Sequence, residues 1–166
     1  MTSKKIIIRE FRTEDVQDLV KIYYNTIHKV NIRDYTQEQV NVWAPETCLE
    51  IKNWAEKFEK TRPFVAIIDN RIVGFVEFES DGHIDCFYCH HEWIGYGVGS
   101  ALMNAIYEKA RQQKIQRIYV AVSITARPFF EKQGFTVTQE QTVLVKGVGL
   151  TNFKMEKLLK LGDSKS

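Results

Sequence analysis

The sequence predicts a mixed α/β domain in which a mostly antiparallel sheet of about seven strands is flanked by helices. Short apolar runs of strand length alternate with longer segments whose apolar residues recur at i, i+3 and i+4 spacing. A chain of 166 residues is long enough for one domain with a substantial core. Its composition, 44% hydrophobic and 27% charged, is that of an ordinary globular chain and not of a disordered one.

The first part of the chain predicts one strand and then a helical segment. Apolar residues recur at helical spacing from Val16 to Ile27, and Thr13 just before them is a suitable N-cap. A second, short helix ends near Ala44, because the proline after it disfavours a helical residue at that position. The expected elements are a strand at residues 5–10 and helices that begin at Thr13, at Thr36 and at Thr47.

The rest of the chain predicts six strands with two helices among them. Asp69 and Asn70 separate two apolar runs, and both residue types tolerate the positive φ of a hairpin turn. In outline the order is β-α-α-β-β-β-α-β-α-β-β, within a single domain at residues 1–160 that is followed by a polar tail at 161–166. The expected strands cover residues 64–68, 71–79, 83–89, 117–122, 141–146 and 150–158, and the expected helices end near Gln113 and Gln133.

One stretch, from Glu92 to Ala110, organises the chain. Gly95, Gly97 and Gly99 alternate through a loop that follows an expected strand and opens the longest helix. Glycine allows positive φ and lets a ligand approach the backbone closely. The N–H groups of a helix's first turn lack intrahelical partners and attract an anion. The stretch therefore predicts a phosphate site, and close packing of helix on strand is the alternative.

Spacing argues against two common phosphate loops. A Walker A loop requires a lysine directly after its last glycine, and here Ser100 follows Gly99. A dinucleotide fingerprint, G-x-G-x-x-G, requires its third glycine at the position of Ser100 and follows the first strand of its fold. A phosphate bound by this loop is therefore expected to belong to another class of ligand.

Two blocks of the sequence resemble motifs of the GNAT N-acetyltransferases. W-I-G-Y-G-V-G-S-A-L is similar to motif A, Q/R-x-x-G-x-G/A, with Ile94 in place of Gln or Arg and with Gly97 and Gly99 matching. S-I-T-A-R-P-F-F-E-K-Q-G-F is similar to motif B, N-x-x-A-x-x-x-Y-x-x-x-G-F, with Ser123 in place of Asn and Phe130 in place of Tyr. The blocks follow the family's order and spacing. The resemblance covers most of the chain and is closest to the bacterial YafP-like acetyltransferases.

This resemblance implies the GNAT fold and acetyl-CoA as co-substrate. In that family the fourth strand splays from the fifth at a bulge, the pantetheine arm of the coenzyme pairs with the fourth strand, and backbone N–H groups of the glycine loop bind the pyrophosphate. The residues implied to bind the coenzyme are Phe87, Tyr88, Cys89, Gly95, Tyr96, Gly97, Val98, Gly99, Ser100, Ser123 and Phe130.

The expected reaction is direct transfer of the acetyl group to a primary amine of a small molecule or peptide in a ternary complex. Asp85, on an expected central strand, is the favoured general base, with a structural carboxylate as the alternative. Glu77 is a second candidate, but we expect it to face solvent. Phe130 cannot replace the family's acidic Tyr, so Tyr88 or water is expected to protonate the leaving sulfur. A catalytically weak acyl-CoA sensor is the alternative, motivated by Phe130 and Ile94.

The acceptor is expected beside the first two helices and their loop, because the coenzyme takes the rest of the opened sheet. The candidates there are Tyr24, His28, Tyr35 and Trp43, with core packing as the alternative for Trp43. No acidic or basic cluster appears in this region, so the acceptor's charge does not follow from the sequence. A homodimer is compatible with the sequence.

Composition limits the other partners. Lys and Arg number 23 and Asp and Glu number 21, a net charge of +2 that is too balanced to favour nucleic acid. No apolar run approaches the roughly 18 residues of a membrane span, and the N-terminus lacks the apolar segment of a signal peptide. We therefore expect no membrane partner and a cytoplasmic location.

The three cysteines, an odd number, predict free thiols in a reducing compartment. Residues 86–90 spell C-x-x-C-H, the haem-attachment motif, and together with His83 and His91 they also suggest a metal. Residues three apart on a regular strand face opposite sides, so Cys86 and Cys89 should diverge. We expect neither haem nor metal.

Overall fold

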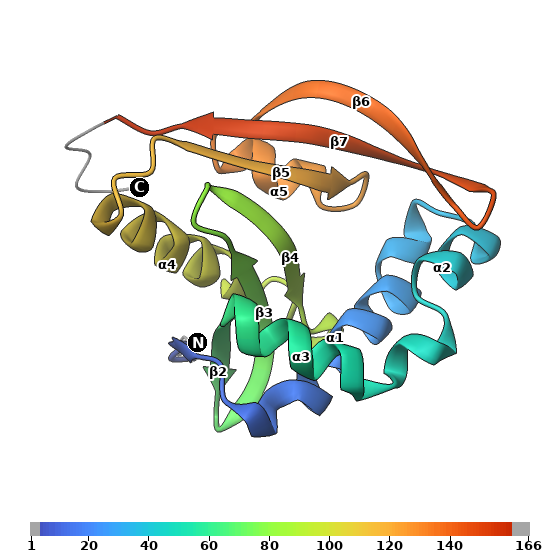
Figure 1. Cartoon of the computed structure of the whole chain (residues 1–166), viewed down its shortest axis with the longest axis horizontal. Helices are drawn as coiled ribbons and strands as arrows, with labels where there is room; N and C mark the ends of the chain where they lie inside the picture. The colour runs from blue at the N-terminus through green and yellow to red at the C-terminus, as the bar shows by residue number, and fades with distance from the viewer. Residues whose placement is uncertain (1–3, 161–166) are drawn as a thin grey trace.

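The computed structural model describes residues 4–160, which form a seven-stranded sheet with helices on both faces (Figure 1). The strand order is β1-β2-β3-β4-β5-β7-β6, and all neighbours are antiparallel except the parallel pair β4 and β5. The mixed α/β class and the mostly antiparallel sheet are thus confirmed. The expected tail at 161–166 lies outside the described residues, so the domain boundary at 160 stays a prediction.

Seven strands and five α-helices make up the described chain, and none of these helices is long and apolar enough to cross a membrane. The strands are β1 (Ile7–Glu10), β2 (Phe64–Ile68), β3 (Arg71–Phe78), β4 (His83–Cys89), β5 (Arg117–Ser123), β6 (Thr136–Val145) and β7 (Val148–Leu158). The helices are α1 (Val16–Lys29), α2 (Gln37–Trp43), α3 (Ile51–Thr61), α4 (Val98–Gln112) and α5 (Arg127–Lys132), with a 3₁₀ turn, η2 (Asn31–Arg33), before α2.

Three details differ from the sequence-based expectations. The outline order has two helices between the first two strands, but α1, α2 and α3 all lie there, as the separate predictions from Thr13, Thr36 and Thr47 require. Strand β6 begins at Thr136 instead of Gln141, because it is an edge strand whose mostly exposed polar residues carry no apolar signal. Thr13 does not cap α1: its hydroxyl donates to Glu59 at 2.7 Å, and Asp15 takes the N-cap position of that helix.

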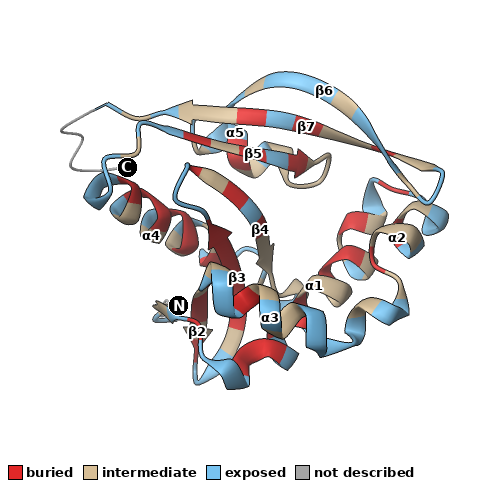
Figure 2. Ribbon diagram, in the orientation of Figure 1, coloured by how far each residue is buried: buried red, intermediate tan, exposed pale blue. Residues whose placement is uncertain are grey.

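Different helices cover the two faces of the sheet (Figure 2). Leu102 and Ile106 of α4 are fully buried against one face, and Phe58 of α3 is fully buried against the other. Burying side chains of this size contributes about 1.5–3 kcal/mol each. Helix α4 can start close above β3 because residue 74 is glycine: a Cβ there would lie 2.9 Å from Val98 Cγ1.

The β6–β7 hairpin closes over α2 at one end of the sheet. The Tyr35 hydroxyl donates to the Thr151 carbonyl at 2.6 Å and accepts from the Ile124 N–H at 3.0 Å. The Gln39 side chain donates to the Gly149 carbonyl at 2.9 Å. These hydrogen bonds join the α2 region and the hairpin into one wall, here called the enclosed wall. Figure 1 shows the turn between β6 and β7 beside α2.

The sheet opens in its middle, between β4 and β5. Only two residues of β4 pair with β5, His83 with Tyr119 and Ile84 with Val120. A register shift inserts one extra residue into β4 opposite β3, between Ile84 and Phe87. Such a bulge bends its strand, and beyond it β4 diverges from β5. The structure therefore contains the bulged, splayed strand that the motif resemblance implies.

A buried ion pair joins β1 to the segment before α1. The Asp15 carboxylate accepts from both Arg9 guanidinium nitrogens at 2.8 and 2.9 Å and from the Arg12 N–H at 2.8 Å. Burial alone would raise the pKa of Asp15, but these hydrogen bonds outweigh it and hold the pKa below its usual value. Asp15→Asn should lower the free energy of unfolding by about 1.5–3 kcal/mol at pH 7.

The Asp15→Asn effect should depend on pH in one direction. A depressed carboxyl pKa stabilises the folded state above the unfolded pKa, and this stabilisation is lost as the pH falls through the folded pKa. Urea unfolding at pH 7 and pH 3 should therefore show a smaller difference from wild type in acid. Asp18→Asn, an exposed position in the same region, is the control; an equal loss at both pH values would contradict the prediction.

Candidate active site

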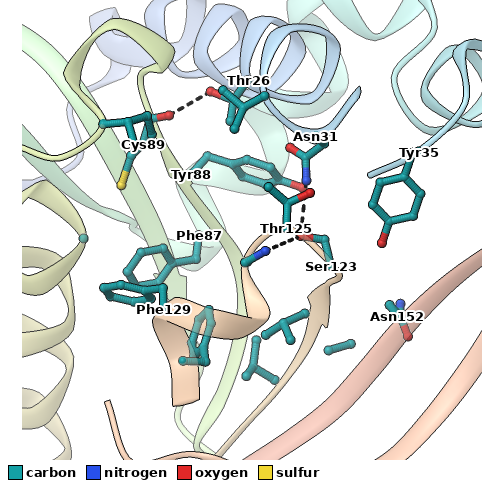
Figure 3. A pocket seen from close by; sticks show the side chains of 18 of the residues that line it. Thr26, Asn31, Tyr35, Phe87, Tyr88, Cys89, Ser123, Thr125, Phe129 and Asn152 are labelled. Atoms are coloured by element: carbon teal, nitrogen blue, oxygen red, sulfur yellow. Dashed lines mark hydrogen bonds between the residues drawn. The ribbon is translucent and has the colours of Figure 1, made fainter. Parts of the chain in front are cut away.

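A cleft of about 620 Å³ runs from the glycine loop through the sheet opening to α2 (Figure 3). Its walls come from the start of α4, from β4, from the end of β5 and the loop after it, and from η2, α2 and the β6–β7 hairpin. This volume lies within the range of small-ligand sites. The sheet opening thus connects the predicted phosphate loop with the predicted acceptor region.

The glycine loop has the backbone that an anion site requires. Gly95 and Gly97 have φ of 89° and 87°, which is unfavourable for residues with a Cβ. Gly97 directly precedes α4, a helix of 15 residues, and Val98 is buried and fixes the helix start on the sheet. The first-turn N–H groups of α4 are therefore presented at the cleft, and these residues fit a pyrophosphate.

Most residues implied to bind the coenzyme share this cleft. Tyr96 differs, because its ring is exposed and packs on Trp93 at 5.0 Å. The assignment of the others as coenzyme ligands stays a prediction. Those that line the cleft are Phe87, Tyr88, Cys89, Gly95, Gly97, Val98, Gly99, Ser100, Ser123 and Phe130.

The two departures from motif B have clear structural roles. The Ser123 hydroxyl accepts from Asn31 Nδ2 at 3.2 Å and from the Ala126 N–H at 3.0 Å, so it joins η2 to the loop after β5. Phe130 is buried, and its ring meets that of Phe87 edge-on at 5.5 Å. Phe130 thus builds the cleft wall and brings no hydroxyl to it.

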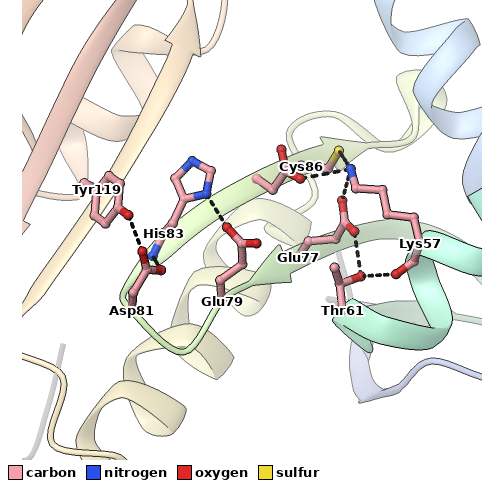
Figure 4. A network of polar contacts seen from close by, with 9 residues as sticks. Lys57, Thr61, Glu77, Glu79, Asp81, His83, Cys86 and Tyr119 are labelled. Carbon is pink, nitrogen blue, oxygen red and sulfur yellow. Dashed lines mark hydrogen bonds and ion pairs between the residues drawn. The ribbon is translucent and has the colours of Figure 1, made fainter.

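A lysine between two carboxylates lies behind the cleft (Figure 4). Lys57 Nζ of α3 is 2.9 Å from Asp85 and 3.0 Å from Glu77. Glu77 is completely buried and accepts from the Thr61 hydroxyl at 2.6 Å. The expectation that Glu77 faces solvent is wrong, because α3 covers this face of the sheet. Asp85 lines the cleft with a side chain 38% exposed.

The bulge in β4 makes this cluster possible. On a regular strand, neighbouring residues face opposite sides, but here Asp85 and Cys86 both reach Lys57 Nζ, which lies 3.7 Å from the Cys86 sulfur. Burial alone would lower the pKa of Lys57, but the acidic groups of Cys86, Glu77 and Asp85 outweigh it and raise the pKa. Lys57 is therefore an ammonium ion at neutral pH.

Tyr88 lies on the part of β4 that has no β5 neighbour. Its ring packs against Tyr23 at 5.0 Å and Phe75 at 6.1 Å, and it also lines the cleft. Burial raises the pKa of Tyr88 well above its usual value. The phenol is therefore protonated at neutral pH, so it can donate a proton but cannot serve as a base.

The acceptor candidates separate into two groups. Trp43 lines the cleft, and its ring meets Tyr35, another lining residue, edge-on at 5.2 Å. Tyr24 and His28 lie outside the cleft: their rings pack together at 4.2 Å, and His28 Nε2 is 2.6 Å from the Ala44 carbonyl oxygen. Helix α1 thus directs these two side chains towards α2.

Sequence reasoning missed several polar groups of the cleft. Asn31, Thr125 and Asn152 all line it. Among the described residues, Thr125 Oγ1 and Asn152 Oδ1 are buried atoms without a hydrogen-bond partner. No motif marks these positions; they come together only because β7 lies beside the end of β5, with Asn152 opposite Ser123.

Two groups of potential metal ligands occur in the described chain. In one, Glu77, Asp85 and Cys86 already surround the Lys57 ammonium. In the other, the rings of His90 and His91 stack within 17° of parallel, so their in-plane lone pairs do not converge on one point. The haem motif also fails geometrically, because Cys86 and Cys89 pack on opposite faces of the sheet. Absence of a metal stays a prediction.

Comparison with known proteins agrees with this geometry. A family model for the acetyltransferase (GNAT) domain matches residues 31–157. The chain belongs to the GNAT acetyltransferases. The Escherichia coli K12 protein described as uncharacterized N-acetyltransferase YafP is 32% identical over 150 residues, which cover 90% of this chain and 94% of that protein. The motif resemblance is therefore confirmed, and this GNAT chain is a transferase by family.

Solved GNAT structures share the fold over nearly the whole chain. A GCN5-related N-acetyltransferase from Rhodopseudomonas palustris superimposes with a TM-score of 0.89 at 28% identity, covering 96% of this chain and 99% of that one. The PaiA N-acetyltransferase from Thermoplasma acidophilum, solved in complex with coenzyme A, gives 0.71 at 19% identity, covering 93% and 99%. The second likeness concerns the fold alone.

Proposed function

We propose that this GNAT acetyltransferase moves an acetyl group from acetyl-CoA directly to a primary amine of a small molecule or peptide in a ternary complex. The observation that carries the proposal is one continuous cleft that joins the glycine loop to Asp85 and Tyr88. The phosphate-binding loop suits acetyl-CoA, an acyl donor that is long and phosphorylated. The Asp85 carboxylate and the Tyr88 phenol in the same cleft suit the proton transfers that an amine acceptor requires.

The coenzyme has a matching surface along this cleft. First-turn N–H groups of α4 bind the pyrophosphate. The part of β4 beyond Ile84 has lost β5 as a neighbour, so its backbone is available to the amides of pantetheine. The fold shared with PaiA, which was solved with coenzyme A, supports this placement.

Each residue near the opening then has a defined task. The Asp85 carboxylate takes a proton from the acceptor ammonium, the freed amine nitrogen attacks the thioester carbon, and the carbon–sulfur bond breaks. The sulfur leaves as a thiolate and takes a proton from the Tyr88 phenol. The nitrogen loses its second proton as the amide forms, and this proton restores the Tyr88 phenol after it has protonated the sulfur. Lys57 holds the Asp85 side chain in place through their ion pair at 2.9 Å. The products are an amide and the free thiol of coenzyme A.

A second candidate function is an acyl-CoA sensor with little catalysis. It is favoured by Phe130, which is buried among aromatic rings where the family has a hydroxyl, and by the exposed apolar Ile94 in the loop. Acetyl-CoA titration with and without a broad amine panel separates the two functions. Coenzyme binding with thiol release supports the enzyme, whereas binding without release for any amine supports the sensor.

Gly97→Ala should weaken coenzyme A binding about tenfold. A Cβ at φ of 87° costs about 1–2 kcal/mol, and the relaxed loop would turn its N–H groups away from the pyrophosphate. Isothermal titration calorimetry with coenzyme A measures this loss. Pantetheine, which lacks the pyrophosphate, should bind both proteins equally.

Gly147→Ala is the matched control. Gly147 also has positive φ, 78°, and a Cβ added there would meet no atom within 4 Å beyond its chain neighbours, but it lies at the β6–β7 turn. The substitution should cost similar backbone strain without changing coenzyme affinity. Equal affinity losses in both variants would mean that the glycine loop has no special role.

A further inference from the structure

We propose that the acceptor is a small primary monoamine that has an aromatic or branched apolar body and a neutral hydrogen-bond donor. The inference rests on the proposed function, because the amine must reach Asp85 and the acyl sulfur. It concerns the acceptor end of the cleft, defined here as the part lined by Arg33, Tyr35, Trp43, Val145, Leu150 and Asn152.

The walls of the acceptor end are mainly apolar. Trp43 and Tyr35 form an edge-on aromatic pair, and Val145 and Leu150 belong to the same hydrophobic cluster. A flat or branched hydrocarbon body would bury its surface against these side chains. A strongly hydrated body, such as a sugar, would lose its water here without matching partners.

Two buried oxygens require a partner that the described chain does not provide. Asn152 Oδ1 can only accept a hydrogen bond, and Thr125 Oγ1 can accept or donate one. Both residues line the cleft, and Figure 3 shows them on its β7 and β5 sides. A ligand with a hydroxyl or amide N–H would satisfy Asn152. A site built for such a donor discriminates against analogues that lack it.

The charges of the cleft argue against a polyamine or an aminoglycoside. Among the described lining residues the charged ones are Arg33 and Asp85. Asp85 is the proposed base and is already paired with Lys57. A second ammonium group on the acceptor would therefore lie in a cleft that offers the Arg33 guanidinium but no further carboxylate. The cleft thus accommodates an acceptor with a single ammonium group.

The enclosed wall limits the size of the acceptor. Hydrogen bonds from Tyr35 to Thr151 and from Gln39 to Gly149 tie the β6–β7 hairpin to the α2 region on the far side of the acceptor end. A polypeptide running through the cleft would have to break both. This favours a small molecule over a peptide.

Matched amine pairs test the proposal by binding alone. Calorimetry on the protein saturated with coenzyme A uses tyramine against 2-phenylethylamine, which differ by one hydroxyl, and octylamine against 1,8-diaminooctane, which differ by one amine. We expect tyramine to bind about fivefold more tightly than 2-phenylethylamine. Octylamine should bind about tenfold more tightly than the diamine, and a neutral peptide amine should bind more weakly than tyramine.

Two substitutions assign the effect to one residue. Asn152→Leu should remove the advantage of tyramine over 2-phenylethylamine, and Asn152→Asp should improve diamine binding several-fold by adding a carboxylate. Asn53→Asp makes the same charge change at an exposed position of α3 and should alter neither ratio. Circular dichroism and thermal melts of each variant establish that it is folded.

The outcomes distinguish this inference from the proposed function. A diamine or peptide that binds the wild type as tightly as the monoamines overturns the inference, as does the absence of binding by all probes. A parallel thiol-release assay with acetyl-CoA addresses the reaction: tight monoamine binding without release would refute the transfer and leave the ligand class intact. Release with a preference for diamines would support the transfer and refute the ligand class.

Discussion

Asp85→Asn should lower kcat for acetyl transfer by roughly 10²–10⁴-fold, the usual contribution of a positioned acid or base. The amide keeps the size and much of the polarity of the carboxylate but cannot take the proton of the acceptor ammonium. Coenzyme A affinity should be unchanged, because Asp85 lies near the start of β4, whereas the glycine loop follows the end of that strand. Steady-state thiol release and calorimetry measure the two quantities separately.

The pH dependence adds a second readout for Asp85. An acceptor amine supplied already deprotonated needs no base, so the rate of the variant should recover partly as the pH rises towards the pKa of the amine. Asp81→Asn, an exposed Asp at the turn before β4, should keep wild-type kinetics. A rate loss below about threefold for Asp85→Asn would show that this carboxylate is structural, since a positioned base contributes far more.

Lys57→Met should lower the free energy of unfolding by about 2–3 kcal/mol at pH 7. Removing one partner of a buried ion pair typically costs about 3–5 kcal/mol, and the smaller figure applies because the Lys57 side chain is 36% exposed. The completely buried Glu77 would lose its counter-ion and keep the hydrogen bond from Thr61. Urea unfolding followed by circular dichroism gives the value.

Two further variants test whether the loss of stability comes from the unpaired Glu77 carboxylate. Lys57→Met and Glu77→Gln combined should recover part of the stability, because the buried carboxylate is then absent. Lys60→Met, an exposed lysine of the same helix, is the control and should change stability by less than about 0.5 kcal/mol. Equal destabilisation by the two single lysine substitutions would contradict the buried cluster.

The sequence predicts those elements whose residues act locally. Asp69 and Asn70 adopt φ of 50° and 64°, as the hairpin prediction requires, and the glycine loop leads into α4 as expected. Strand β4 and its neighbours also lie where their apolar runs place them. These features depend on backbone preferences of a few adjacent residues, which a single sequence contains.

The remaining parts of the site depend on contacts between distant residues. Glu77 alternates with apolar residues as an exposed position would, and only the placement of α3 brings Lys57 opposite it. The bulge that turns Asp85 towards the same lysine has no glycine or proline to mark it. The sequence predicts His28 in the acceptor groove, but the rotation of α1 directs it to Ala44 instead.

The short pairing between β4 and β5 has a consequence for the thermal stability of the protein. With only two residue pairs between β4 and β5, few main-chain hydrogen bonds join the β1–β4 and β5–β7 portions of the sheet. A molecule bound between β4 and β5 would contact both portions and replace the missing backbone hydrogen bonds. Because such a ligand binds only the folded protein, it stabilises that state by mass action. The melting temperature should therefore rise with the concentration of any ligand that contacts both portions of the sheet.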